Sequence, residues 1–85
     1  MTDDAAAQIA ALRASIDDVD EEIAAAVARR RELSAGIQRV RRGSGGPPRE
    51  PSRVSVVVDR YADRLGHGGA DVGRAVLRAC LPPDA

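Results

Sequence analysis

The sequence predicts an all-α fold: one long helix followed by two shorter ones, forming a single domain over residues 1–85. Residues 5–42 contain no proline and a single glycine, and they are rich in the strong helix formers Ala, Arg, Glu, Ile and Leu. Two stretches rich in glycine and proline then divide the remaining chain into segments of helical length. Together these observations favour three helices joined by loops.

The long helix, predicted over residues 5–42, carries apolar residues that recur every seven positions in two registers. These residues, here called the apolar seam, are Ile9, Ile16, Ile23 and Ile37 in the first register, and Leu12, Val19, Ala26, Leu33 and Val40 in the second. They occupy the a and d positions of a heptad repeat. At ~1.5 Å per residue the helix is about 57 Å long, more than so short a chain can wrap around. We therefore expect the seam to lie against a second copy in an intertwined homodimeric bundle.

The other elements follow from breaks in the sequence. Residues 43–51 (GSGGPPREP) predict a loop, and residues 52–65 resume a helical pattern of apolar positions. Four residues, GHGG, interrupt the chain again, and residues 70–81 predict a short third helix that stops at Pro82. A run of valines within residues 52–65 favours a strand locally, so the prediction of a helix there depends on the helical spacing of its apolar residues.

Composition narrows the classes of function. The formal net charge is zero, which argues against a general nucleic-acid binder, and the single cysteine has no partner for an internal disulfide. No Cys/His cluster predicts a metal site, and no apolar stretch approaches the roughly 20 residues of a membrane span. We expect a cytoplasmic protein with no cofactor. All 13 basic residues are arginine, the side chain suited to bidentate binding of carboxylates.

One position interrupts the apolar seam. Arg30 stands at an a position between Ile23 and Ile37, where a cation needs a partner because a buried unpaired charge is costly. That partner is either an acidic residue of a second copy or an anionic ligand held between helices. Arg41 lies three helical turns further along nearly the same face, and in an antiparallel pair Arg13 of one chain approaches Arg30 of the other.

Several segments are similar to a known family. They are LRASIDDVD at 12–20, ARRREL at 28–33, GIQRVR at 36–41, RV at 53–54 and DRY at 59–61. In this order, and without a gap over the first helix, they resemble the all-helical chorismate mutases of the AroQ type. The resemblance implies the pericyclic rearrangement of chorismate to prephenate, a step of aromatic amino acid biosynthesis in the shikimate pathway, or of a related secondary pathway. The reaction needs no cofactor.

The resemblance also implies roles for individual residues. Arg30 of one subunit and Arg13 of its partner would bind the two substrate carboxylates, and Arg41 would contact the ether oxygen. Arg53 corresponds to an arginine at the start of the second helix, and Glu50 to an acidic residue near the substrate hydroxyl. The catalytic candidates are therefore Arg30 and Arg41. The others are expected to bind substrate.

Two positions depart from the family pattern. Val54 stands where a glutamate usually binds the substrate hydroxyl, and the glutamine that family members carry late in the third helix has no counterpart before Ala85. The first departure keeps a 4-amino-4-deoxychorismate mutase or an isochorismate pyruvate-lyase open as alternatives. The chain also resembles short members that dock on a 3-deoxy-arabino-heptulosonate 7-phosphate (DAHP) synthase, although its ending, CLPPDA, lacks their arginine-rich tail.

A hypothesis from another class is a helical dimer without enzymatic activity, serving as an adaptor or nucleic-acid-binding coiled coil. Its support is the charge distribution of the long helix, acidic over residues 17–22 and basic over residues 29–42. The helix dipole favours the same distribution in any solvated helix. Steep salt dependence of DNA affinity would distinguish this hypothesis from an enzyme.

Overall fold

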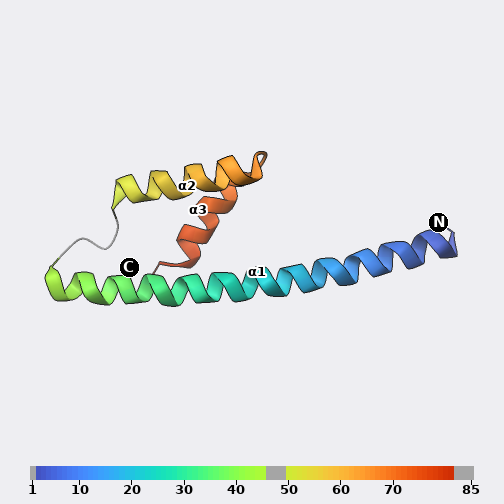
Figure 1. Ribbon diagram of the computed structural model, residues 1–85, viewed down its shortest axis with the longest axis horizontal. Coiled ribbons are helices and arrows are strands. Elements are labelled where there is room, and N and C mark those ends of the chain that lie inside the picture. Colours follow the sequence, from blue (N-terminus) through green and yellow to red (C-terminus); the bar gives the residue numbers. More distant parts are fainter. Residues whose placement is uncertain (1, 46–49, 82–85) are drawn as a thin grey trace.

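The computed structural model describes residues 2–45 and 50–81 and contains three helices there (Figure 1). They are α1 (Asp3–Ser44), α2 (Pro51–Leu65) and α3 (Gly69–Ala79). Their arrangement is extended, 62 × 23 × 17 Å along its principal axes, because α1 alone runs the full length of the molecule. The predicted all-helical class with a long first helix is confirmed.

The first helix is longer at both ends than the predicted 5–42. It begins at Asp3 because the hydroxyl of Thr2 accepts a hydrogen bond from the backbone N–H of Ala5 at 3.1 Å, which caps the amino terminus. It continues to Ser44 and ends at Gly45, whose left-handed backbone (φ 77°) closes the last turn. The prediction missed both ends because caps depend on single residues.

The loop predicted over residues 43–51 is shorter at both edges. Gly43 and Ser44 belong to α1, and Pro51 is the first residue of α2, where its fixed φ suits a helix start. Residues 46–49 of this prediction lie outside the described residues. The third helix starts at Gly69 and ends at Ala79, before the predicted end at residue 81, and Pro82 also lies outside the described part.

The two short helices pack closely against each other through glycines of α3. A Cβ atom at Gly69 would press on the carbonyl oxygen of Tyr61 and lie 2.9 Å from Cα of Ala62, and one at Gly73 would lie 3.1 Å from Cβ of Tyr61. Only glycine allows this approach of the two backbones. Val57 of α2 is buried.

The end of α3 is attached to the middle of α1 by two hydrogen bonds. Arg31 donates from Nε to the carbonyl of Ala79 at 2.8 Å, and the hydroxyl of Ser34 donates to the carbonyl of Cys80 at 3.3 Å. These carbonyls lack partners within α3 because they lie at its carboxyl end. Each bond contributes on the order of 1 kcal/mol and sets α3 across α1.

The apolar seam is uncovered in the single chain. Its eight Ile, Leu and Val side chains are between 36% and 73% exposed, and no residue of α1 is buried. Figure 1 shows the amino-terminal half of α1, drawn in blue, extending beyond α2 and α3. An uncovered stripe of this length marks an interaction surface. The predicted intertwined dimer stays a prediction, which this exposure supports.

Candidate active site

A pocket of about 250 Å³ lies where the carboxyl-terminal half of α1 faces the start of α2 and the end of α3. From α1 it is lined by Arg30, Leu33, Ser34, Ile37, Gln38 and Arg41. From α2 and the residue before it come Glu50, Arg53, Val54 and Val57, and from the end of α3 come Leu77, Cys80 and Leu81. The pocket therefore joins three guanidinium groups and one carboxylate to an apolar wall, which suits a small dianion with a hydrocarbon body.

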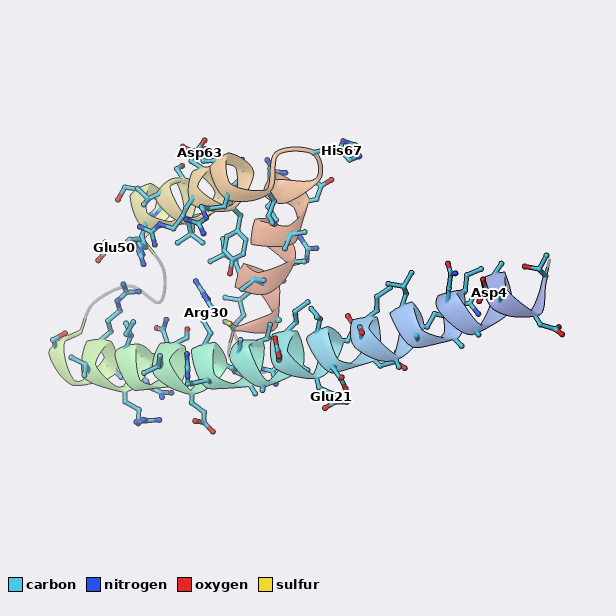
Figure 2. All side chains as sticks on the ribbon, turned by 45° about the vertical axis from the view of Figure 1, so that its right-hand side comes forward. Asp4, Glu21, Arg30, Glu50, Asp63 and His67 are labelled. Carbon is cyan, nitrogen blue, oxygen red and sulfur yellow. The ribbon has the colours of Figure 1, made fainter. Side chains whose placement is uncertain are left out.

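Helical periodicity places the α1 residues on one side. Ser34, Ile37 and Arg41 follow Arg30 at four, seven and eleven residues, spacings that return to nearly the same face. Figure 2 shows the Arg30 side chain pointing from α1 toward α2 and α3, whereas Glu21 points away from them. Arg30 is half-buried in this single chain. Its side chain lines the pocket, and the partner of Arg30, an acidic residue of a second copy or an anionic ligand, stays a prediction.

Arg41 and Glu50 both line the pocket and pair with each other. The Nη2 atom of Arg41 lies 3.5 Å from Oε1 of Glu50, with the arginine side chain 22% exposed and the carboxylate 58% exposed. A pair this long and this exposed is weak, so an incoming anion can replace the carboxylate as partner of Arg41. Glu50 is held by its backbone, since its carbonyl accepts hydrogen bonds from the N–H groups of Arg53 and Val54 at 3.0 and 3.1 Å.

The first turn of α2 supplies the facing wall. Arg53 is exposed and Val54 half-buried, and both line the pocket. Val54 therefore presents an apolar surface to the pocket. The structure thus brings Arg30, Arg41 and Glu50 together with these two residues.

Arg13 is the predicted site residue that the pocket does not contain. It lies on the exposed amino-terminal half of α1, next to an apolar groove lined by Leu12, Ser15, Ile16 and Val19. Seventeen residues of continuous helix separate it from Arg30, a rise of about 25 Å, which no arginine side chain spans. Within one chain, Arg13 and the pocket are separate.

Sequence reasoning missed several pocket residues. A second hollow of about 310 Å³ adjoins the first, shares Arg30, Arg53 and Val57 with it, and adds Arg60, Tyr61, Arg64 and Leu65. The spacing of Arg53, Arg60 and Arg64 along α2 repeats the seven and eleven of α1 and was a usable signal. Gln38 gave a weaker signal, because polar residues on a helix are mostly solvated. Cys80 is buried and also forms part of the pocket wall.

The described residues, 2–45 and 50–81, offer neither a metal site nor a membrane-spanning helix. They contain no group of three or more His, Cys, Asp and Glu side chains able to hold a metal ion. Within that same part of the chain, no helix has both the length and the apolar character needed to cross a membrane.

Comparisons with known proteins agree on one family. The model of chorismate mutase type II matches residues 12–81. The intracellular chorismate mutase of Mycolicibacterium smegmatis is 43% identical over 77 residues, covering 91% of this chain and 74% of that protein. The intracellular chorismate mutase of Mycobacterium tuberculosis is 42% identical over 71 residues, covering 84% and 67% respectively.

A solved structure extends the likeness to the fold. It is a chain in the non-covalent complex of DAHP synthase and chorismate mutase from Corynebacterium glutamicum with a bound transition state analog. The two chains superpose with a TM-score of 0.85 at 28% identity, over 91% of this chain and 93% of the other.

Proposed function

The chain belongs to the chorismate mutase type II family and is a chorismate mutase, and we propose that two copies complete each of its active sites. The pocket of one subunit supplies Arg30, Arg41, Arg53, Glu50 and Val54, and the partner subunit supplies its own Arg13. The observation that carries this proposal is that three arginines converge on one pocket, while the apolar seam of α1, which forms part of its wall, is uncovered and open to a second chain.

The carboxylates of chorismate determine how it is held. Three guanidinium groups against one carboxylate leave the pocket with an excess of positive charge. Arg30 binds one substrate carboxylate, and Arg13 of the partner subunit reaches the other, as the family resemblance implies. Arg53 also lines the pocket and adds its positive charge to the electrostatic field that attracts the carboxylates. Holding both carboxylates keeps the enolpyruvyl arm folded over the ring, which removes the entropy cost of reaching that geometry.

The rearrangement breaks the carbon–oxygen bond of the ether while the far carbon of the enolpyruvyl arm bonds to the ring. Three electron pairs shift around a six-membered ring of atoms, and no proton or leaving group is exchanged with the protein. Negative charge grows on the ether oxygen as its bond to the ring breaks. Arg41 donates to that oxygen, and a fixed donor to developing charge stabilises the transition state more than the ground state.

Glu50 and Val54 concern the substrate hydroxyl. Glu50 lies at the pocket opening and accepts from that hydroxyl once substrate has taken over Arg41. Val54 removes a second acceptor from the same wall. Chorismate is then held mainly through its carboxylates, so the 4-amino analogue and isochorismate are the informative competitors. Replacement of Val54 with Glu should add an acceptor to this wall. The variant should therefore bind a substrate that carries an amino or hydroxyl group there more tightly than one that lacks such a group.

The seam of α1 supports the dimer. Exposed Ile and Leu side chains at heptad positions gain about 25 cal/mol for each Å² that a second chain covers. An antiparallel crossing of two α1 helices covers these side chains and carries Arg13 of each chain toward Arg30 of the other. A single pairing therefore buries the seam and completes the site.

We also propose a partner enzyme, on the basis of the structural neighbour. That neighbour is a chorismate mutase in complex with a DAHP synthase. We expect this chain also to associate with such a synthase, which starts the aromatic pathway that a chorismate mutase branches. The relatives' names, which call them intracellular, support the expected cytoplasmic location.

The test is direct. Purified protein is given chorismate, and loss of its ultraviolet absorbance is followed while prephenate is identified by NMR. Parallel reactions use 4-amino-4-deoxychorismate and isochorismate, each with and without a DAHP synthase. Prephenate formation above the uncatalysed rate is the expected result, and faster release of pyruvate from isochorismate would overturn chorismate as the preferred substrate. The sharing of each site is tested by mixing Arg13→Ala and Arg30→Ala subunits, and a mixture that stays inactive after subunit exchange would overturn it.

A further inference from the structure

We propose that Arg60 and Arg64 of α2 form a docking surface for a second copy of this chain, on which they bind Asp20 of the partner subunit. This contact holds the α1 helix of the second copy in the register that brings Arg13 of the partner subunit to the pocket. Such a role rests on the proposed function and deepens it, because it identifies the contact that positions the shared arginine.

The docking surface lies in the second hollow, which is strongly positive. Four guanidinium groups line it, those of Arg30, Arg53, Arg60 and Arg64, and no described acidic side chain does. Neither Arg60 nor Arg64 forms an ion pair with another described residue, although α2 itself carries two aspartates. Four like charges around one hollow of about 310 Å³ repel one another. The hollow therefore favours an anionic group that the described part of this chain does not supply.

Asp20 carries a carboxylate on the side of α1 that meets this hollow in a dimer. It follows Arg13 by seven residues, so both lie on one stripe of the helix, and each comes directly after a seam residue. Positions next to such a seam form ion pairs between paired helices. Asp20 is exposed and has no ion pair with any described residue. A second chain that turns its Arg13 toward the pocket therefore turns its Asp20 toward the same side.

The direction of α2 brings the opposite charges together. Figure 1 shows α2 running back along α1, from the carboxyl-terminal end of α1 toward its middle. A second α1 helix that lies antiparallel to the first therefore runs in the same direction as α2. With Arg13 of the partner subunit at Arg30, Asp20 of the partner subunit lies about 10 Å further in this direction.

The arginines of α2 lie at matching distances. Arg53 lines both the pocket and the second hollow, as Arg30 does. Arg60 and Arg64 follow Arg53 by about 10 and 16 Å along the axis of α2. Asp20 of the partner subunit then falls beside Arg60, with Arg64 one turn beyond. Its two carboxylate oxygens accept hydrogen bonds from both guanidinium groups.

Arg13 depends on a contact of this kind because its own chain does not hold it in place. The amino-terminal half of α1 extends beyond α2 and α3, and the apolar seam repeats at every heptad. Apolar contacts alone therefore allow pairings that are shifted by a heptad, which would move Asp20 by about 10 Å away from the arginines. The ion pair forms in one register only, so Asp20 is a positioning residue that acts on the site through Arg13.

The test reverses the charges in two separate chains, Asp20→Arg in one and Arg60→Glu with Arg64→Glu in the other. Each variant alone sets like charges against each other at both contacts of its dimer. Its dimer dissociation constant, measured by sedimentation, should rise at least about tenfold. In a mixed dimer one contact is reversed and the other is native, so both attract. The mixture should associate within about threefold of the wild-type constant and regain the chorismate activity that each variant lacks at the same concentration.

The matched control is Glu21→Arg, which makes the same change of charge one residue further along α1. Figure 2 shows Glu21 pointing away from α2 and α3. This variant should dimerise as tightly as the wild type. Mixed with the chain that carries Arg60→Glu and Arg64→Glu, it should restore less association than Asp20→Arg does.

Neutral substitutions give a second, milder measurement. Asp20→Asn and the pair Arg60→Gln, Arg64→Gln each remove the same contact. Combining all three substitutions in one chain should therefore weaken the dimer no more than the more damaging of the two variants does.

The outcomes separate two failures. Charge-reversed variants that dimerise like the wild type, or a mixture that gains nothing over its components, overturn the docking surface while the wild type remains a dimeric chorismate mutase. If a charge-reversed chain does not fold, independent effects of the neutral substitutions overturn it instead. A wild-type protein that stays monomeric or leaves chorismate unchanged overturns the proposed function itself.

Discussion

Exchange of subunits between two inactive variants tests whether each site is shared. The perturbation is Arg13→Ala in one preparation and Arg30→Ala in another. A rise of about 25 Å along α1 separates the two positions, so one chain cannot bring both guanidinium groups to one substrate. Each variant alone should lose at least about a hundredfold in kcat/KM, because each lacks one carboxylate partner at every site.

Mixing the two variants and letting the subunits exchange should restore activity. Half of the dimers then contain one chain of each kind, and one of their two pockets has Arg30 together with Arg13 of the partner subunit. The mixture should therefore reach about a quarter of the wild-type rate, as two-fold symmetry requires. The assay is the initial rate of chorismate loss before and after unfolding and refolding the mixture together.

The matched control mixes wild type with the double variant, which carries the same substitutions in one chain. Sharing predicts that this control also falls to about a quarter after exchange. If each chain instead uses its own Arg13, the single-variant mixture stays inactive and the control keeps about half the wild-type rate. That pair of results would refute the shared site.

Three further predictions concern rate, association and packing. Arg41→Ala should lower turnover about a hundredfold in the same rate assay, since it removes the charged donor to the ether oxygen, and unchanged turnover would contradict this role. Ile16 occupies a seam position and is 57% exposed in the single chain, so Ile16→Asp should yield monomers in sedimentation because it would bury a charge in the interface. The control Asp17→Ala, beside it, should not. A dimeric Ile16→Asp variant would show that the seam is not the interface. Gly69→Ala should destabilise the fold by about 1–3 kcal/mol because the added methyl group meets the backbone of α2. Gly43→Ala, with nothing within 4 Å, should stabilise it by up to about 1 kcal/mol in thermal unfolding at equal concentration, and equal effects of the two would contradict the close contact.

The long helix was predictable because its pattern is local. A seven-residue repeat depends only on the geometry of one helix, so the seam and the exceptional Arg30 can be read without knowing the rest of the fold. The ends were less predictable, since each depends on one residue. Thr2 starts the helix two residues early, and Gly45 ends it two residues late.

Beyond Arg30 and Arg41, which the heptad pattern and helical spacing single out, the pocket was predictable only where the chain resembles its family. Arg41, Glu50 and Arg53 were assigned by resemblance, and the structure brings them to the pocket that also holds Arg30. Gln38 was missed because a sequence pattern does not distinguish a polar side chain facing a pocket from one facing water. The crossing of α2 and α3 at Gly69 was also missed, because it depends on which helices meet and not on either helix alone.

In the proposed dimer, where two copies complete each site, the uncovered half of α1 ties the activity of this enzyme to its abundance. An isolated helix in water gains little from its own hydrogen bonds, so these amino-terminal turns persist chiefly through what they touch. Dilution therefore frays them and disperses the arginines by mass action, and the melting temperature should climb as more protein is added. In a cell, the concentration of the protein would then determine the activity of each molecule as well as the total activity.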